Sequence, residues 1–444
     1  MLSALSPLDG RYVTGTTPLR DFFSEYALIR YRVFVEIEYL KALISLPLSG
    51  LESLNTKDIF TALDNIVSNF DEMEAMKIKE TENKTNHDVK AVEYYIKDEM
   101  TRLNLGKYLE FVHLGLTSQD INNTAFPLML RDALEKVMIP KLKQVLSDIE
   151  AKSIEYKGIP MLAHTHGQPA SPTTLGKEFQ VFSERLQDES EVLKAQRIKC
   201  KFGGATGNFN AHKVTYPNIN WQVFADQLTA KMGLYRSKHT TQIAHYDDIA
   251  AICHNFIRIN TILIDFCRDM WSYISMDYFK QKVKEGEVGS SAMPHKVNPI
   301  DFENAEGNLG MAIAVFEFMA AKLPVSRLQR DLTDSTVLRN LGVPFGHTLI
   351  ALNSIIKGIG KLQLNHQALD RDLEQNWAVV AEAIQNILRR ELYPEPYETL
   401  KTLTRGKVSI TQKDIQQFIL NLNIDESIKN EMLLITPQNY IGYY

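Results

Sequence analysis

The stretch IAAICHNFIRINTILIDFCRDMWSYI, residues 249–274, decides the fold class. Its large apolar residues recur at steps of three or four, at Ile249, Ile252, Phe256, Ile259, Leu263, Phe266, Met270 and Ile274. That spacing places them on one face of a helix. No glycine or proline interrupts positions 234–285, so we expect a helix much longer than the average of about 11–12 residues.

Helical periodicity continues outside this stretch. A second series with the same spacing comprises Phe22, Tyr26, Ile29, Val33, Ile37, Leu40 and Ile44. Residues 172–199 and 302–323 also have helical patterns, and Pro127 and Pro140 are expected to kink or divide the helix after Asn122. Alternating strand patterns are scarce, and no strand–helix–strand rhythm is present.

These patterns predict an all-α protein of three helical domains, in which a long central bundle assembles with other subunits. The predicted domains are an N-terminal helical domain at 1–106, the long-helix bundle with its glycine-containing loop at 107–359, and a C-terminal helical cap at 360–444. The apolar stripes themselves are interpreted as core packing.

Composition excludes several classes of protein. The 444 residues exceed one ordinary core, and 44% hydrophobic with 23% charged residues is typical of a globular chain. A formal charge of −5 without a basic stripe argues against a nucleic-acid partner. The N-terminus lacks the features of a signal peptide, and no apolar run reaches the roughly 18 residues of a membrane span. The three cysteines are widely spaced, so we expect a reducing, cytoplasmic location.

Residues 286–299, GEVGSSAMPHKVNP, hold the densest group of reactive side chains. The glycines permit strained backbone and close approach of a ligand. The side chains of Ser290, Ser291, His295, Lys296 and Asn298 could then all address one polar substrate. A solvated loop between helices is the alternative, and the number of reactive groups favours a functional site.

A second cluster is AHTHGQPASP at residues 163–172. A His-x-His pair such as His164 and His166 can ligate a metal, but the further ligands after later strands are missing, so we expect no metal. A buried, hydrogen-bonded histidine is another possibility. The neighbouring glycine, Gln168 and prolines favour a shaped loop that presents an imidazole, which titrates near neutral pH.

Three more polar segments are each weaker evidence. Residues 82–93, ENKTNHDVKAVE, could be a capped helix start with a charged first turn. Residues 117–123, TSQDINN, could be a helix cap whose amides and hydroxyls suit a carboxylate. Residues 326–339, SRLQRDLTDSTVLR, hold three arginines that could bind carboxylate or phosphate, or form a salt-bridged surface helix.

The segment GGATGN at 203–208 lacks the Lys-Ser/Thr ending of a nucleotide-phosphate loop. It is interpreted as a structural turn or a backbone-lined rim.

Taken together, the polar segments resemble a known family. The loop GSSAMPHKVNP at 289–299 resembles the signature of the fumarase/aspartase superfamily, and residues 117–122 and 164–168 are similar to its other two active-site segments, in the expected order. DGRY at 9–12, TNHD at 85–88 and the arginines of 327–339 resemble the adenylosuccinate lyase family, particularly its longer bacterial form. The resemblance covers residues 6–441. The chain stops at IGYY, 441–444, where the family usually continues for a further helical segment; we expect this to affect the packing of the last helix and not the chemistry.

The resemblance implies a carbon–nitrogen lyase of purine biosynthesis. Such an enzyme eliminates fumarate from adenylosuccinate, leaving AMP, and from succinylaminoimidazole carboxamide ribotide, leaving aminoimidazole carboxamide ribotide. It implies no cofactor, nucleotide substrates, no nucleic-acid or membrane partner, and a homotetramer whose active sites are shared between subunits.

The family pattern also implies residue roles. Ser290 is assigned as the base, assisted by Lys296 and loop amides, and His166 as the acid; the sequence does not decide between His166 and His87 as the acid. Lys296, Asn298, Thr117 and Ser118 are expected to hold the succinyl carboxylates. The remaining expected substrate contacts are Arg11, Tyr12, Asn86, His87, Asp88, Gln242, Arg330, Ser335, Thr336 and Arg339, and Glu303 is a supporting catalytic residue.

Three rival interpretations remain open from the sequence. The first is another fumarate-forming lyase, such as argininosuccinate lyase, fumarase or aspartase, which the nucleotide-end motifs disfavour. The second is a metal-dependent hydrolase built on His164 and His166. The third is a catalytically silent helical scaffold, which predicts a disrupted loop or a missing His166, and the sequence has neither defect.

Overall fold

The computed structural model describes residues 2–282, 297–404 and 410–443. The chain divides into two compact units. Unit 1 comprises Met1–Leu142, Glu189–Thr261 and Gly307–Asn353, and unit 2 comprises Lys143–Asp188, Ile262–Glu306 and Ser354–Tyr444. The three-domain division expected from the sequence stays a prediction.

The predicted long helix is present as α12, Asp247–Ser275, with 29 residues. Its inward series from Ile249 to Met270 is buried, with Phe256, Leu263 and Phe266 fully enclosed. By length and composition alone α12 could cross a membrane, but 61% of its most apolar 18-residue window is buried inside the protein. Burial of this kind is that of a core helix.

Unit 1 contains the helices of the first third of the chain. They are α1 Val13–Thr16, α2 Arg20–Phe23, α3 Glu25–Ile44, α4 Lys57–Ser68, α5 Glu72–Thr85, α6 Asp88–Arg102 and α7 Ser118–Ala133, with 3-10 turns η1 Thr17–Leu19, η2 Glu52–Leu54 and η3 Gly106–Phe111. The Ser24 side chain caps α3 by accepting from the Ala27 amide. Because Arg32 and Glu36 are also buried, α3 is enclosed beyond its apolar face.

The two prolines act differently. Pro127 lies inside α7 and has no amide hydrogen to give the Asn123 carbonyl four residues earlier; the backbone amide of Lys201 bonds to that carbonyl instead, at 3.3 Å. Pro140 lies at the start of α8, Ile139–Glu155, after the π-helical turn η4 Leu134–Met138. The backbone stays helical from Ala133 to Ile139, so the helix changes its hydrogen-bonding pattern just before Pro140 without ending there.

The rest of unit 1 includes α10 Asn210–Thr215, α11 Trp221–Lys231 and α14 Thr333–Leu338. The short strands β3 Lys199–Cys200 and β4 Tyr235–Arg236 pair in parallel. Parts of α12, of α13 Ile300–Lys322 and of α15 Gly342–Lys361 complete the unit, and Phe256, Phe316 and Phe345 pack there at centroid distances of 4.9–5.5 Å.

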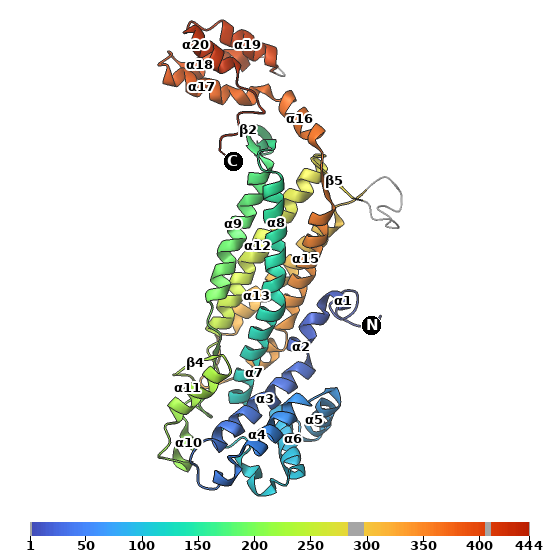
Figure 1. Ribbon diagram of the computed structural model, residues 1–444, viewed down its shortest axis with the longest axis vertical. Coiled ribbons are helices and arrows are strands. Elements are labelled where there is room, and N and C mark those ends of the chain that lie inside the picture. The colour runs from blue at the N-terminus through green and yellow to red at the C-terminus, as the bar shows by residue number, and fades with distance from the viewer. Residues whose placement is uncertain (1, 283–296, 405–409, 444) are drawn as a thin grey trace. The chain divides into compact units, whose positions relative to one another are not determined.

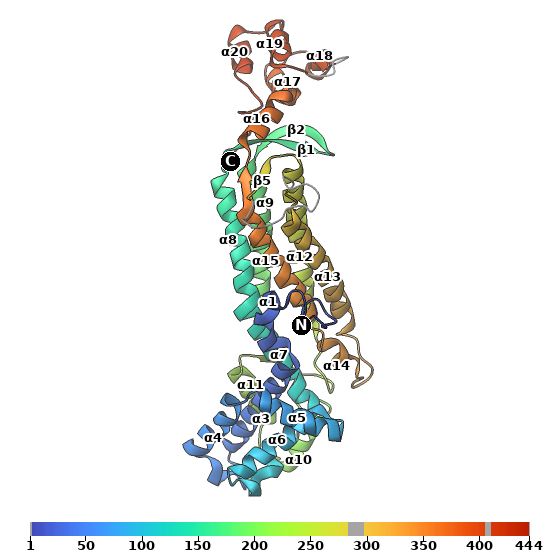
Figure 2. The same cartoon turned by 90° about the vertical axis from the view of Figure 1, so that its right-hand side faces the viewer.

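Unit 2 is a bundle with a helical C-terminal part. Segments of α8, α9 Leu175–Ala195, α12, α13 and α15 lie side by side (Figures 1 and 2). Phe266 packs against Phe179 and Phe302, at centroid distances of 5.9 and 6.2 Å. The later elements are α16 His366–Gln375, η5 Trp377–Val380, α17 Ala381–Arg390, α18 Pro396–Thr404, α19 Gln412–Leu420 and α20 Glu426–Leu433.

Two antiparallel strand pairs belong to unit 2: β1 Pro160–Thr165 with β2 Gln168–Thr174, and β5 Phe279–Gln281 with β6 Leu362–Leu364. All sheets among the described residues are two-stranded. The mostly helical fold class predicted from the sequence is confirmed.

Candidate active site

The turn between α5 and α6 carries three of the expected site residues. Asn86 ends α5 in the left-handed conformation, with φ 52°, which asparagine tolerates better than most residues. His87 caps α6, and its Nδ1 accepts the Lys90 backbone amide at 3.1 Å. The neutral ring therefore carries its proton on Nε2, where it can donate a hydrogen bond. Asp88 follows as the first residue of α6.

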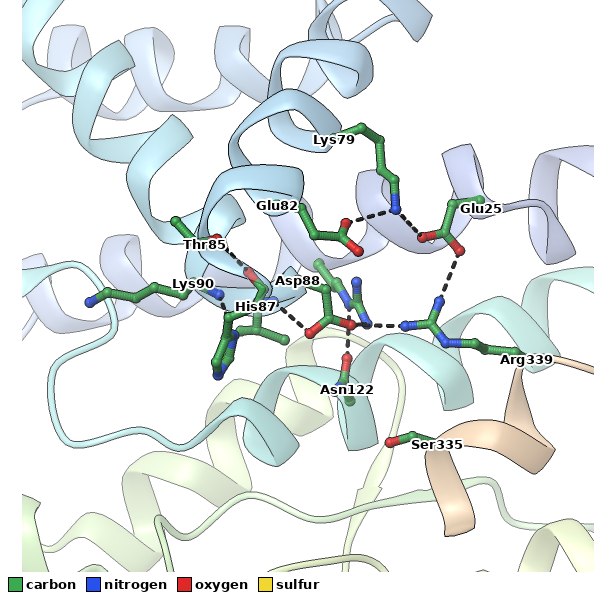
Figure 3. A network of polar contacts seen from close by, with 12 residues as sticks. Glu25, Lys79, Glu82, Thr85, His87, Asp88, Lys90, Asn122, Ser335 and Arg339 are labelled. Carbon is green, nitrogen blue, oxygen red and sulfur yellow. Dashed lines mark hydrogen bonds and ion pairs between the residues drawn. The ribbon is translucent and has the colours of Figure 1, made fainter. Parts of the chain in front are cut away.

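Asp88 is the centre of an arginine network (Figure 3). Its Oδ2 accepts from Arg32 Nη2 at 2.6 Å and from Arg339 Nη2 at 2.9 Å. Arg32 also donates from Nε to Asn122 Oδ1 at 2.8 Å, and Arg339 donates from Nη1 to Glu25 Oε2 at 2.9 Å. One carboxylate thus joins α3, α6 and the end of α14, and through Arg32 it reaches α7.

Burial sets the electrostatics of this network. Burial lowers the pKa of Arg32, and the nearby Asp88 opposes that effect. Burial alone would raise the pKa of Asp88, but the charge of Arg32 and other partners hold it below its usual value. Asp88 is therefore ionised at neutral pH and serves as the counter-ion of two arginines.

The N-terminus of α7 holds the expected carboxylate contacts. Thr117 caps the helix, and its amide donates to Asp120 Oδ2 at 2.8 Å. Thr117 and Ser118 are partly exposed, whereas Gln119 is buried. With its amide oxygen toward Arg330, Gln119 accepts from Nη2 at 2.5 Å and from Nε at 3.2 Å. The segment 117–123 is therefore bonded to the arginine segment 326–339.

The arginine segment and Gln242 are held in the same unit. Arg330 Nη2 donates to Ser335 Oγ at 3.2 Å, and Thr336 is exposed in the next position of α14. Gln242 Nε2 donates to the Ala205 carbonyl at 3.2 Å. Hydrogen bonds in unit 1 therefore join three of the sequence clusters, 82–93, 117–123 and 326–339, into one network.

A buried tyrosine completes the link between these clusters. Tyr246 donates to Asp334 Oδ2 and accepts from Asn123 Nδ2, both at 2.7 Å. The Asn123 side-chain oxygen accepts from the Ala244 amide at 2.7 Å. The segment that carries Gln242 is thereby fixed against α7 and α14.

Arg11 and Tyr12 precede α1, with the Arg11 guanidinium 6.0 Å from the centre of the Tyr12 ring. A cavity of about 200 Å³ opens beside this stretch and is lined by Leu8, Asp9, Thr16, Leu19, Arg20, Phe23, Ser24, Gly342, Val343 and Gly346. Neither Arg11 nor Tyr12 lines it, so their substrate contacts stay a prediction.

His166 lies at a hairpin tip in unit 2. Thr165 pairs with Gln168, which leaves His166 and Gly167 as a two-residue turn with φ of 54° and 74°. Two positive φ values are those of a type I′ turn. The sequence predicted a shaped loop here; the structure shows a hairpin whose tip, 164–169, is exposed.

Asn298 and Glu303 also belong to unit 2. Asn298 is half-buried just before α13, and Gln281 Nε2 donates to the neighbouring Val297 carbonyl at 3.3 Å. Glu303, in the first turn of α13, accepts from Trp271 Nε1 at 3.0 Å. The predictions for Ser290 and Lys296 fall outside the described residues.

Sequence reasoning missed the buried cations Arg32 and Lys201. Arg32 was hidden in an apolar helix face, and Lys201 precedes a segment that was interpreted only as a turn. Both side chains are almost fully buried. The position of Arg32 next to Ile29 and Val33 of the apolar series was the available signal, because charged residues near a buried helix face are rarely enclosed without a partner.

Comparisons with known proteins identify the family. A lyase family model matches residues 10–315, and a model described as adenylosuccinate lyase C-terminal matches residues 326–441. The chain is 57% identical to adenylosuccinate lyase of Dictyostelium discoideum, over 99% of this chain and 97% of that protein. The chain belongs to the adenylosuccinate lyase family.

Bacterial adenylosuccinate lyases are also close relatives. Those of Legionella pneumophila (strain Corby) and Escherichia coli (strain K12) are 48% and 46% identical, each over 99% of this chain and 97% of the relative. The fold resembles 3-carboxy-cis,cis-muconate lactonizing enzyme from Pseudomonas putida, with a TM-score of 0.78 at 19% identity, over 96% of this chain and 94% of that one. The family and superfamily resemblance seen in the sequence is confirmed, and the C-terminal match favours adenylosuccinate lyase over the other fumarate-forming lyases.

Proposed function

We propose that the protein eliminates fumarate from adenylosuccinate, giving AMP, and from succinylaminoimidazole carboxamide ribotide, giving aminoimidazole carboxamide ribotide. It is thereby a carbon–nitrogen lyase of purine biosynthesis. The near full-length identity of 57% to an adenylosuccinate lyase carries this proposal. The bonded network of unit 1 supports it, because it gathers cationic and amide groups suited to an anionic substrate.

The reaction requires an acid and a base. A base removes a weakly acidic proton from the carbon β to the departing nitrogen, and the charge spreads into the adjacent carboxylate as a dianionic aci-carboxylate. The electron pair of the C–H bond becomes the second bond of the fumarate double bond. The electron pair of the C–N bond leaves with the nitrogen, which then takes up a proton. Positioned donors that stabilise the developing charge supply much of the rate enhancement in such sites.

Ser290 is assigned as the base and His166 as the acid. A serine hydroxyl is a poor base at neutral pH, so the charge of Lys296 would stabilise its alkoxide. His166 suits an acid that must meet a substrate, since it is exposed at a turn. His87 is the alternative acid, and its Nε2–H suits donation either to a leaving nitrogen or to a phosphate.

The other groups bind the two ends of the substrate. Thr117 and Ser118, at the N-terminus of α7, would hold the succinyl carboxylates together with Lys296 and Asn298, because helix amides and dipole favour anions there. The nucleotide end would be held by Arg11, Tyr12, Arg330, Ser335 and Arg339, and Asn86, Gln242 and Thr336 would be further substrate contacts. Asp88 would act as the counter-ion that aims Arg339.

We infer that the enzyme is a homotetramer with shared sites. The exposed hairpin tip with His166 is available to another subunit. Large apolar side chains, including Trp271, Met311 and Phe318, are 46–57% exposed on α12 and α13, and such surfaces are typical of subunit interfaces. A cytoplasmic location is consistent with free thiols at Cys200, Cys253 and Cys267.

A substrate panel tests the reaction. Purified protein is incubated with adenylosuccinate, argininosuccinate, aspartate and malate, and fumarate is measured. Release from adenylosuccinate alone is expected. Preferential release from argininosuccinate, malate or aspartate would replace the proposal with one of the other lyases of the superfamily.

Subunit mixing tests the site. Ser290→Ala and His166→Ala should each lower kcat by about 100-fold or more, the scale of general acid–base catalysis. If the two residues meet across subunits, exchange between the two inactive variants should restore part of the activity. Near-normal turnover of either variant contradicts its assignment, and inactivity after demonstrated exchange contradicts shared sites.

A further inference from the structure

A buried ion pair lies directly behind the N-terminus of α7. Lys201 Nζ and Asp120 Oδ1 are 2.7 Å apart, and both side chains are completely buried. Burial lowers the pKa of Lys201, and the charge of Asp120 opposes that effect. Two charges in the protein interior lose their hydration, and apolar residues of similar size often stabilise a fold equally well. Stability alone is therefore a weak explanation for this pair.

Asp120 organises three backbone amides around it. Its Oδ2 accepts from Thr117 N at 2.8 Å, and its Oδ1 accepts from Gly203 N at 2.8 Å. Gly204 N is 3.1 Å from each oxygen. The carboxylate therefore fixes the cap of α7 and the 203–204 turn at once.

Lys201 holds the other side of the same turn. Its Nζ donates to the Gly204 carbonyl at 2.5 Å. The next carbonyl along the chain, that of Ala205, accepts from Gln242 Nε2 at 3.2 Å. The pair is therefore hydrogen-bonded directly to Thr117, and it is connected to Gln242 through the adjacent residues Gly204 and Ala205. Thr117 and Gln242 are two of the expected substrate contacts.

Glycine is required where these segments meet. Gly204 has φ +78°, and a Cβ there would lie 3.3 Å from the Gly115 carbonyl oxygen. A Cβ on Gly203 would lie 2.9 Å from the Gly207 carbonyl oxygen. Glycine thus lets the 203–207 turn approach both Asp120 and the chain before α7.

We propose that Asp120 and Lys201 are positioning residues, which set the Thr117–Ser118 cap and the backbone that orients Gln242 toward the substrate. This role rests on the proposed elimination reaction. The pair does not contact the reacting atoms; it acts through the groups that do. Its loss should therefore weaken binding of the succinyl end more than it slows turnover.

The test uses a neutral variant of nearly the same shape. In Asp120→Asn, a side-chain NH2 group replaces one of the two carboxylate oxygens. The backbone amides that donate to Asp120, among them those of Thr117 and Gly204, then have one accepting oxygen instead of two. The double variant Asp120→Asn with Lys201→Met also removes the buried cation. A matched control neutralises an exposed ion pair of similar length, Arg390 with Glu431 at 2.6 Å, as Arg390→Met with Glu431→Gln.

Steady-state kinetics and product inhibition are measured on the full chain. In the two test variants, KM for adenylosuccinate and Ki for fumarate should rise about tenfold, while kcat and Ki for AMP change less than about threefold. The control should behave as the unmodified chain. Helical content from circular dichroism establishes whether each variant is folded.

Each outcome has a defined meaning. A folded test variant with unchanged KM and Ki for fumarate overturns the positioning role. Failure of both test variants to fold also overturns it, since the pair would then serve stability alone. Absence of fumarate release by the unmodified chain would instead count against the proposed function, which separates the two failures.

Discussion

His212 should make the folded chain sensitive to mild acid. It lies in α10, beside the Asp120–Lys201 pair, and is 2% exposed. Tyr39 donates its hydroxyl hydrogen to the Leu114 carbonyl at 2.6 Å, so it accepts from His212 Nε2, 3.0 Å away. His212 Nδ1 is therefore unprotonated, and it is buried without a hydrogen-bond partner among the described residues. A second proton on this ring would be enclosed without an acceptor.

The size and sign of the effect follow from the pKa. Burial lowers the pKa of His212 from 6.5 to about 4. Between these values the unfolded chain binds the proton and the folded chain does not. The contribution of neutral His212 to the free energy of unfolding is therefore complete above pH 6.5 and is lost as the pH falls toward 4. At about 1.4 kcal/mol per pH unit, the loss is about 3 kcal/mol across the window.

Chemical denaturation at pH 7 and at pH 4.5 measures this loss. Trp221 lies against His212, with ring centroids 4.8 Å apart, and contributes a fluorescence signal. His212→Phe keeps a ring of similar size that cannot titrate. The unmodified chain should lose about 2–3 kcal/mol more than this variant between the two pH values. Equal losses would refute the reasoning, because the acid sensitivity would then come from other groups.

Two further substitutions test the packing around the site. Arg32→Met removes the hydrogen bonds to Asp88 and Asn122 and should lower the free energy of unfolding by about 2–3 kcal/mol, while Asp88 keeps Arg339 as a partner. An unchanged midpoint of urea denaturation would contradict this estimate. Gly115→Ala should destabilise by about 2 kcal/mol or more, because Gly115 has φ +72° and a Cβ would lie 2.9 Å from the His212 ring. A melting temperature equal to that of the unmodified chain would show that this turn can relax.

Local periodicity was sufficient to predict several of the long helices. The series from Ile249 to Ile274 predicted α12 because a continuous apolar stripe has one simple solution, a helix that buries it. A kink or division was expected at Pro140 because proline lacks an amide hydrogen, and the structure has a π-helical turn there within a continuous helix. The hairpin with His166 was not predicted as strands, since its prolines and polar residues do not alternate in the manner of a half-buried sheet.

Contacts between distant segments could not be read from the sequence. The segment 117–123 was predicted as a helix cap for a carboxylate, and α7 does begin there. The partners of that segment lie elsewhere in the chain: Lys201 is 81 residues from Asp120, and Arg32 is 90 residues from Asn122. Periodicity carries no information on such pairs, because they depend on how helices pack.

The motif residues themselves could be recognised from the sequence because side chains of one chemical type, when clustered, bind only a few kinds of ligand. Clustered arginines with hydroxyls, as at 326–339, indicate an anion. The structure adds that Asp88 already neutralises part of this charge, so the network's net charge toward a substrate is smaller than the arginine count suggests.

The most direct test of the central claim is product stoichiometry with purified protein. Adenylosuccinate is supplied as the only substrate, and AMP and fumarate are quantified together over time, with the Ser290→Ala variant as the control for contaminating activity. The account predicts equal amounts of AMP and fumarate from the unmodified chain and a rate at least about 100-fold lower from the variant. Adenylosuccinate left intact by the folded chain, or products formed equally by both proteins, would contradict it.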